Sequence, residues 1–392
     1  MTLPEPSATP GPCAGIRIVD MSSMIAGPFC SQILADLGAE VIRIEAAGSD
    51  PMRAKYPVYK GMSAMFEQMN RGKKSVCIDV KSEEGRQLIH QLVAQADMFL
   101  QNSRPGVMER LGLGYDVLKA INDKLIYVSV SGFGEVGPYA TRPAYDMMIQ
   151  GLTGFMPTQG GEGDPAPIRT TLADRVTAMW ASHAALAALL HRERTGEGQK
   201  VTVDMASAYA ACIVVDQMQN HTFQSAELDE VDLYLGSYRS LKTADGAAIG
   251  MILQPAQFNR FVTALGCEDM LGDERFAEPM SILQNTDELY DRVASRVAAM
   301  TTKQFIELMD EAQIPFSKVN TMEEFVASDE AHHCGVFAEF DDPEWGTIKH
   351  INYPAKFGGS PANARHRAPK LGEHNEEIRQ LLAKSGARTD AG

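Results

Sequence analysis

The sequence predicts an α/β protein with a mostly parallel sheet that helices cover on both faces. Short β-rich runs alternate with segments of helical periodicity through the first half of the chain, which is the pattern of βαβ units. The length of 392 residues suits about two domains, and an apolar content of 44% is ordinary for a packed core. The acidic stretch at 224–235 indicates a linker or a domain crossing.

The expected strands are short apolar runs such as "GIRIVD" and "EVIRIE". Between these two, "FCSQILADLG" has apolar residues at helical spacing and ends at Gly38, a favourable helix stop. Helices are also expected at 82–96 and near 115–122. The strands are expected at 15–20, 40–45, 75–80, 97–102, 125–131 and 200–205.

A long, largely buried helix is expected from Leu172 to the charged turn "RERTGEGQ". Its apolar positions recur at steps of three and four, which is the helical period. They are Leu172, Val176, Met179, Trp180, His183, Ala187 and Leu190. A helix rich in Met and Ala follows the last strand and extends to about His221.

Residues 225–335 are expected to form a smaller α+β domain. It contains a hairpin that turns at Asp245-Gly246, and helices near 256–265, 286–299 and 302–312. A hairpin at 337–354 and a C-terminal helix at 373–384 come after it.

Charge and cysteine usage exclude several classes of protein. The net charge of −15 disfavours binding to nucleic acid or to anionic membranes. The six cysteines lie far apart without a C-x-x-C pair, which is typical of the reducing cytosol. Residues 1–14 form a proline-rich, flexible tail without the apolar core of a signal peptide. We therefore expect a cytoplasmic protein.

The segment "SVSGFGEVGPYATRPAYD" contains G-x-G-x-x-G, the pattern of a dinucleotide-binding loop. Such a loop needs a helix directly after its last glycine, so that the helix amides hold the pyrophosphate. Here Pro138 follows Gly137, and Pro143 comes soon after, so no undisturbed helix is expected. The loop is predicted to be an active-site or turn loop and not a nicotinamide site.

Basic residues gather in "NRGKKS" and "NSRPGVMER", each at the edge of an expected strand. A solvated surface and a site for a phosphorylated ligand are both open interpretations. Asp174, at the start of the long helix, suits either a helix cap or a nucleophile that the helix dipole keeps ionised. Asp146 is expected to cap the next helix. No metal site is expected, because His332-His333, in an expected exposed loop, has no third ligand at useful spacing.

These motifs together resemble the class III CoA-transferases, the family of formyl-CoA transferase and carnitine CoA-transferase. The resemblance runs from about Gly15 to the C-terminal helix. The segments on which it rests are "AGPFCSQILADLGAEVIRIE", "NRGKKSVCIDV", "NSRPGVMERLGLGYDVLKAIN", "LIYVSVSGFGEVGPYATRPAYD", "LADR" and "HRERTGEGQKVTVDM".

The resemblance implies a Rossmann-like large domain built from both chain ends, residues 15–224 and 336–392, with the smaller domain between them. It also implies a homodimer of two interlocked, ring-like subunits. Asp174 falls on the family's nucleophile. It would form a mixed anhydride with the donor acyl group and then an aspartyl-CoA thioester, from which an acceptor carboxylic acid takes the CoA. No metal is implied.

CoA contacts carry over to several positions of this sequence, and a substrate pocket is implied at the glycine loop. Ser103 and Ala46 depart from the pattern, since an aromatic residue and a basic residue or proline are common there. The CoA contacts are Met24, Ile25, Ala26, Lys73, Lys74, Asn102, Arg104, Val107 and Arg110, and the pocket residues are Gly134, Tyr145 and Asp146.

Two alternatives to a transferase remain open. The α-methylacyl-CoA racemases of the same superfamily use a histidine that falls on Tyr145, and tyrosine is a poor base at neutral pH. A CoA-binding protein without turnover would fit the departures at Ser103 and Ala46. Both alternatives rank below the transferase.

Overall fold

The computed structural model describes residues 11–46, 48, 50–161, 163–223, 239–362 and 366–386. The chain divides into two compact units: residues up to 160, 164–216 and from 330 onward make the larger one, and residues 217–329 with 161–163 make the smaller one. Residues 1–10 of the expected tail and the expected linker at 224–235 lie outside the described residues. Cys13, also assigned to the tail, is buried, and its N–H donates to the Leu37 carbonyl over 2.8 Å. The flexible tail therefore does not extend to residue 14.

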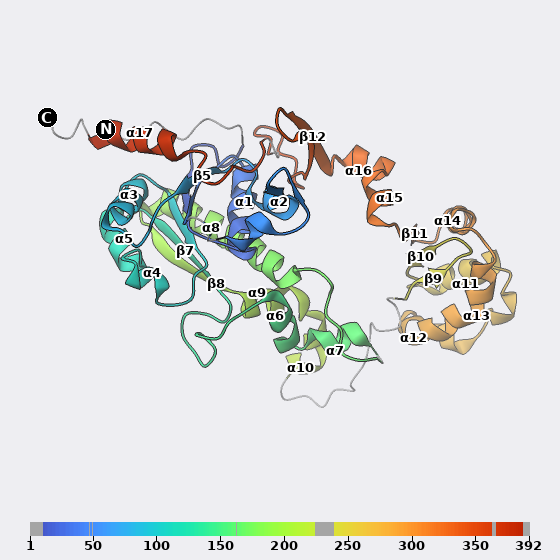
Figure 1. The fold of residues 1–392 in the computed structure, drawn as a ribbon. Helices are drawn as coiled ribbons and strands as arrows, with labels where there is room; N and C mark the ends of the chain where they lie inside the picture. The colour runs from blue at the N-terminus through green and yellow to red at the C-terminus, as the bar shows by residue number, and fades with distance from the viewer. Residues whose placement is uncertain are drawn as a thin grey trace. The chain divides into compact units, whose positions relative to one another are not determined.

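The larger unit is built on a six-stranded sheet with the order β5–β2–β1–β6–β7–β8. Figure 1 labels β5, β7 and β8 of this sheet, with the helix α8 beside them. All neighbouring strands in this sheet run parallel, as predicted. In sequence order they read 3-2-1-4-5-6, so the winding direction reverses between β1 and β6 and leaves a crevice at their carboxyl ends. The strands are β1 (Arg17–Asp20), β2 (Glu40–Glu45), β5 (Lys74–Cys77), β6 (Met98–Gln101), β7 (Ile126–Ser131) and β8 (Gln199–Asp204).

Helices cover both faces of this sheet because its strands are apolar on both sides. Ile18 faces one helical layer and the next residue, Val19, faces the other, since successive side chains in a strand point to opposite faces. The first layer holds α1 (Ala26–Asp36) and α8 (Leu172–Thr195); the second holds α3 (Glu83–Val93), α5 (Tyr115–Ile121) and α17 (Asn375–Gly386).

The long helix expected from Leu172 is α8, but it does not bury the face that its periodicity predicted. The residues that it packs on the sheet and on α1 are mostly small, including Ala178, Ala181 and Ala185. Trp180 and Leu190 are 45% and 52% exposed. Small side chains let α8 approach its neighbours closely, and the large apolar side chains are left on its outer face.

Shorter elements connect the layers of the larger unit. The helix expected to reach His221 ends at Ile213, and a separate short helix follows it. The short elements are β3 (Val58–Tyr59), β4 (Met62–Ser63), α2 (Ala64–Asn70), α4 (Val107–Arg110), α6 (Asp146–Leu152), α7 (Phe155–Gly160) and α9 (Met205–Ile213). The short helix after α9, α10 (Gln219–Thr222), belongs to the smaller unit.

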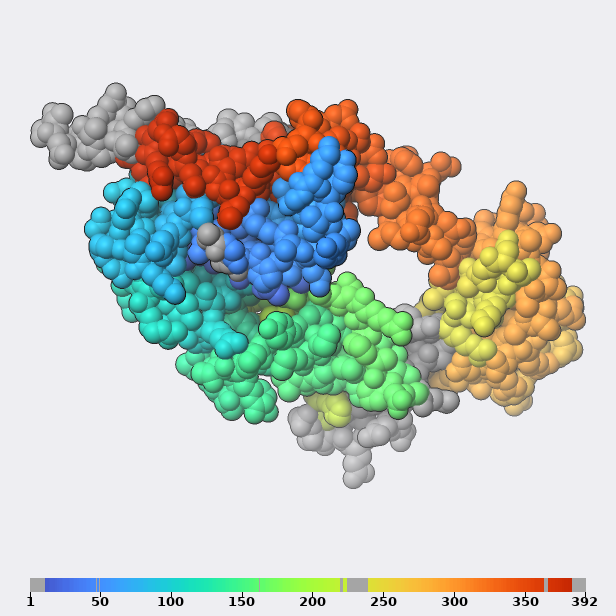
Figure 2. Space-filling model, in the orientation of Figure 1, coloured from blue at the N-terminus to red at the C-terminus, as the bar shows by residue number. Residues whose placement is uncertain are grey.

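The C-terminal part of the chain folds back onto the N-terminal part, as Figure 2 shows for the red and blue residues. The expected hairpin is β12 (Phe337–Asp342) and β13 (Gly346–Ile351). From β13, the buried His350 ring contacts the Glu67 carboxylate of α2 over 2.8 Å. His332 and His333 are exposed, but they lie on the helix α16 (Asp329–Cys334) and not in the expected loop.

The smaller unit contains an antiparallel sheet with the order β11–β10–β9. The predicted hairpin around Asp245-Gly246 is confirmed by the pairing of β9 (Leu241–Lys242) with β10 (Ala247–Gly250). The third strand is β11 (Phe316–Lys318). The helices are α11 (Pro255–Ala264), α12 (Pro279–Gln284), α13 (Thr286–Ala298), α14 (Thr302–Glu311) and α15 (Met322–Val326), of which α12 and α15 were not predicted.

Candidate active site

Two loops are joined by hydrogen bonds at the carboxyl ends of β1 and β6. Asn102, which follows β6, accepts a hydrogen bond from the Ser23 N–H over 2.9 Å and donates to the Ser23 carbonyl over 2.8 Å. The next residue, Met24, has a φ of 66°, a strained conformation for a residue other than glycine. The structure thus brings Met24, Ile25, Ala26 and Asn102 together at the switch point of the sheet.

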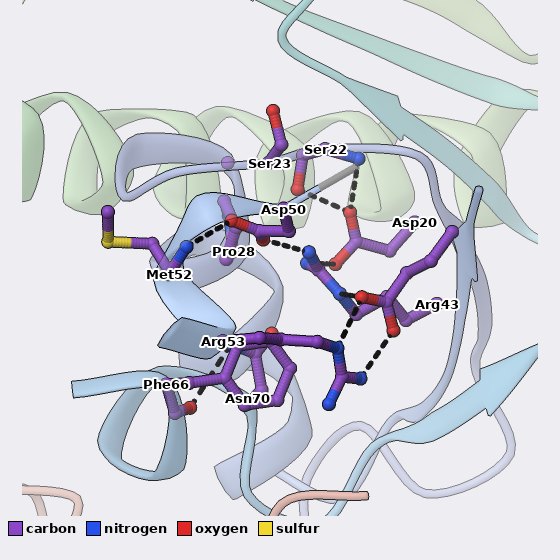
Figure 3. A network of polar contacts seen from close by, with 12 residues as sticks. Asp20, Ser22, Ser23, Pro28, Arg43, Asp50, Met52, Arg53, Phe66 and Asn70 are labelled. Carbon is purple, nitrogen blue, oxygen red and sulfur yellow. Dashed lines mark hydrogen bonds and ion pairs between the residues drawn. The ribbon is translucent and has the colours of Figure 1, made fainter. Parts of the chain in front are cut away.

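Asp20 ends β1 beneath this turn and is fully buried in a network of charges (Figure 3). Its carboxylate accepts hydrogen bonds from the Ser22 N–H over 2.8 Å and from the Ser31 hydroxyl over 2.5 Å. Burial alone would raise the pKa of Asp20, but the charges of Lys73 and Arg43 and these hydrogen bonds outweigh it, and the pKa is lowered. The ionised Asp20 therefore holds the turn that carries Met24 and Ala26.

Asp174 lies in the first turn of α8, half-buried, with its carboxylate accepting a hydrogen bond from the Ala26 N–H. Burial and the nearby charge of Asp146 raise the pKa of Asp174 to about 7. The expectation that the helix N-terminus keeps this carboxylate fully ionised is therefore wrong at neutral pH. Desolvation and repulsion between two carboxylates outweigh the helix dipole and the Ala26 hydrogen bond.

Asp146 holds Asp174 in place from the neighbouring helix. One Asp146 oxygen accepts a hydrogen bond from the Asp174 N–H over 3.0 Å, and the other accepts from the Gln150 side chain over 2.6 Å. The expectation that Asp146 caps its own helix is wrong, since Tyr145 is the N-cap residue of α6. Asp146 instead satisfies a free amide in the first turn of α8.

Gln150 is a further positioning residue that the sequence analysis missed. Its side-chain amide donates to the carbonyls of Ile168 and Thr170, and its oxygen accepts from the Ile168 N–H over 2.9 Å. These bonds fix the segment that leads into α8. Its spacing of four residues from Asp146 on one helix was the available signal.

The glycine loop that follows β7 resembles a nucleotide fingerprint in sequence only. No helix begins between Gly137 and Asp146, as predicted. Gly132 packs so closely on Ala144 that an added Cβ would lie 2.1 Å from the Ala144 Cβ. Gly134 has a φ of 84°, and Tyr145 is 61% exposed. The loop therefore presents Tyr145 to solvent immediately before Asp146.

The basic residues of the sequence divide into two groups. Arg104 and Arg110 are exposed, and within the described part of the chain neither guanidinium has an ion-pair partner. Val107 and Arg110 begin and end α4, at the carboxyl edge of the sheet. These side chains are available to a ligand.

Lys73 and Lys74 require a correction, because they lie at the start of β5 and the side chains of both are engaged within the protein. The buried Lys73 ammonium donates to the Pro28 carbonyl over 2.8 Å and to the Asn70 side chain over 2.9 Å, and it pairs with Asp20. Burial lowers the pKa of Lys73 to about 8. Lys74 pairs with Glu40 and Glu377, each at 2.8 Å. The structure therefore does not place these lysines beside a bound phosphate.

Two cavities of the larger unit bear on the position of a ligand. One of about 220 Å³ adjoins the carboxyl ends of β6 and β7 and is lined by Ser103, Arg104, Ser129 and Glu135 among others. The larger, of about 670 Å³, lies where β2 and β5 begin, and most of its charged groups are in ion pairs, as Arg71 is with Asp36. Asp174 lies at the carboxyl edge of the sheet, and the smaller cavity adjoins this edge. The smaller cavity is therefore the one relevant to a ligand of Asp174.

Two further properties concern only the residues that the structure describes. None of their helices is both long and apolar enough to cross a bilayer. No group of three His, Cys, Asp or Glu side chains among them is placed to hold a metal ion.

The fold and the site define an α/β protein with a partly desolvated carboxyl group, that of Asp174, near the switch point of a doubly wound sheet. The chain belongs to CoA-transferase family III, whose profile matches residues 13–375. The resemblance seen in the motifs is thereby confirmed, and with it an enzyme of the class III CoA-transferase type.

Relatives and solved structures agree with this assignment over nearly the full chain. An acyl-CoA transferase from Fusarium pseudograminearum is 34% identical, covering 96% of this chain and 86% of the relative. A succinate–glutarate CoA-transferase from Agrobacterium fabrum is 30% identical, with 94% of each chain covered. The crystal structure of a CaiB/BaiF family protein from Brucella suis aligns with a TM-score of 0.85 at 31% identity, covering 95% of this chain and 100% of that chain.

Proposed function

We propose that this enzyme moves CoA from an acyl-CoA thioester to a free carboxylic acid, with Asp174 as the nucleophile. The observation that carries the proposal is the position of Asp174. Its carboxylate lies at the start of α8, receives the Ala26 N–H, and stands at the switch point where ligands of doubly wound sheets bind. The transferases among its relatives support the same reaction class.

In the proposed reaction the Asp174 carboxylate attacks the thioester carbonyl, forming a mixed anhydride and releasing CoA thiolate. The thiolate returns to the aspartyl carbonyl, which gives an aspartyl-CoA thioester and frees the donor acid. The acceptor carboxylate attacks this thioester, breaks its C–S bond and forms a second anhydride with release of CoA thiolate. CoA thiolate then attacks the acceptor acyl carbonyl and regenerates the Asp174 carboxylate, so the cycle consumes no water.

The surrounding residues receive distinct roles in the proposal. The Ala26 N–H stabilises the negative charge that develops at the aspartyl group, as a backbone donor at a helix start does. The Met24–Ala26 turn and Asn102 flank the pantetheine arm. Arg104 and Arg110, with Val107, contact the nucleotide end of CoA. Gly134 and Tyr145 line the acyl pocket, and Asp146 orients Asp174.

Trapping the intermediate tests this proposal. The enzyme is mixed with an acyl-CoA, quenched with hydroxylamine and digested, and the peptide that carries Asp174 is examined by mass spectrometry. We expect a hydroxamate on Asp174. Because only the ionised carboxylate attacks and its pKa is raised to about 7, the initial rate of hydroxamate formation should increase from pH 6 to pH 8.

Asp146→Asn is the matched control. Asparagine keeps the oxygen that accepts from the Asp174 N–H, loses the bond from the Gln150 amide, and removes the negative charge that raises the pKa of Asp174. The midpoint of the rise in the rate of hydroxamate formation should then shift to a pH lower by about one unit. Absence of any hydroxamate across a panel of acyl-CoAs contradicts the proposed route. Solvent deuterium at the α-carbon without an adduct would indicate racemase chemistry instead.

The proposal includes a homodimer, which the exposed face of α8 supports. Met179, Trp180 and Leu190 leave apolar surface open on this face, and such a patch typically marks an interface between proteins. Sedimentation equilibrium should give twice the chain mass. Trp180→Glu should shift the protein toward monomer, whereas Val117→Glu, at an exposed apolar residue of α5, should not. An unchanged dimer in Trp180→Glu would exclude this face.

A further inference from the structure

Arg175, the residue after Asp174, has no role in the proposed reaction. Its side chain is half-buried, and its guanidinium carbon lies 4.9 Å from the centre of the Phe29 ring. Phe29 belongs to the first turns of α1, and its N–H donates to the Ile25 carbonyl. Arg175 therefore lies between the starts of α1 and α8, next to Asp174.

Among the arginines that are buried or half-buried in the described part of the chain, Arg175 differs from the others because its guanidinium is in no ion pair. Within those residues its guanidinium has neither a hydrogen bond nor an ion pair, although the chain carries 51 acidic against 36 basic residues. All the others are in ion pairs: Arg17, Arg43, Arg53, Arg71, Arg86, Arg192, Arg239 and Arg367.

A half-buried guanidinium without a partner calls for an anionic ligand. Its five N–H groups form a planar fork that fits a carboxylate or a phosphate. Burial lowers the pKa of Arg175 and the charge of Asp174 raises it, and arginine remains charged throughout the physiological range. The Phe29 ring supports the guanidinium from one side by a cation–π contact, which leaves the N–H edge free.

The place of Arg175 identifies the kind of anion. Asp174 must reach the thioester carbonyl, and the charges of Asp174 and Arg175 act on each other, so the guanidinium lies near the bound acyl group. The phosphates of CoA are separated from the thioester by the whole pantetheine arm. A carboxylate at the far end of the acyl chain is therefore the anion within reach.

We infer that Arg175 binds the distal carboxylate of a dicarboxylic substrate, so that the enzyme transfers CoA between dicarboxylic acids. The inference rests on the proposed function, because it takes Asp174 as the group that receives the acyl chain. Arg175 is then the residue that selects a dicarboxylic over a monocarboxylic acyl group.

Succinyl-CoA and butyryl-CoA test the inference, since their acyl chains have the same length and differ in the distal carboxylate. We expect wild-type kcat/KM to favour succinyl-CoA by about 100-fold, the size of a charge-assisted contact. Arg175→Met should lower kcat/KM by about 100-fold for succinyl-CoA and by less than about threefold for butyryl-CoA. Arg169→Met, at an exposed arginine in the segment before α8, makes the same charge change and should retain the preference.

Binding separates failure of this inference from failure of the proposed reaction. In Asp174→Asn, which cannot turn over, titration calorimetry should show succinyl-CoA binding at least tenfold more tightly than butyryl-CoA, and the added Arg175→Met change should remove the difference. Equal affinity of Asp174→Asn for succinyl-CoA and butyryl-CoA overturns the inference. An equal loss of kcat/KM for the two donors in Arg175→Met also overturns it. Absence of an Asp174 hydroxamate while the binding preference persists overturns only the covalent mechanism.

Discussion

Asp174→Asn is expected to lower the transferase kcat by at least about 10⁴-fold, because it removes the group that carries both covalent intermediates. The amide keeps the shape of the side chain and leaves the Asp174 N–H bonded to Asp146. The loss should therefore appear in kcat, with little change in the affinity for CoA. Steady-state kinetics and calorimetry on the same preparation check both statements.

The same substitution should also stabilise the protein at alkaline pH. The folded-state pKa of Asp174, about 7, lies above its ordinary value of 3.8, so the native state holds this proton more tightly than the unfolded chain. Stability therefore falls as pH rises from about 4 to about 7 in the wild type. Asp174→Asn removes this dependence, and its melting temperature should exceed that of the wild type at pH 8 and match it near pH 4. Asp164→Asn, at an exposed aspartate, is the control. Full activity in Asp174→Asn would exclude the nucleophile assignment.

Lys73→Met is expected to lower the free energy of unfolding by about 3–5 kcal/mol, which is the usual effect of removing one partner of a buried ion pair. Its ammonium and the Asp20 carboxylate are both fully buried, 3.4 Å apart. Without Lys73 the pKa of Asp20 loses its largest lowering influence. The turn at Met24 depends on the ionised Asp20 through Ser22. Urea unfolding measures the loss.

Lys74→Met is the matched control, because Lys74 is partly exposed and its ion pairs should contribute about 1 kcal/mol or less. If Lys73→Met does not fold, the pair Lys73→Met with Asp20→Asn keeps the test available, since the neutral amide needs no counter-charge and should recover most of the stability. If Lys73→Met unfolds like the wild type but binds CoA more weakly, Lys73 contacts a phosphate of CoA after all.

The alternation of apolar runs and helical segments was sufficient to predict the sheet and most of its helices. Parallel strands such as "EVIRIE" are buried on both faces, so their composition is distinctive without knowledge of their neighbours. The proline at 138 likewise excluded a nucleotide-binding helix, because proline acts through its own backbone. Local chemistry of this kind can be read from adjacent residues.

The site depended on contacts that no local pattern encodes. Asp146 and Asp174 are 28 residues apart, and their hydrogen bond exists because α6 and α8 begin at the same place in the fold. The sequence predicted Lys73 as a phosphate ligand. In the structure its ammonium lies beside Asp20, 53 residues away in the chain. The periodicity of α8 identified a helix but not which face a neighbour covers. The sequence by itself determined the fold class and the family, because backbone preference and apolar pattern act over short ranges. The tertiary structure decided the charge of Asp174, the burial of Lys73 and the unpaired state of Arg175, because desolvation and ion pairing depend on residues that meet only after folding.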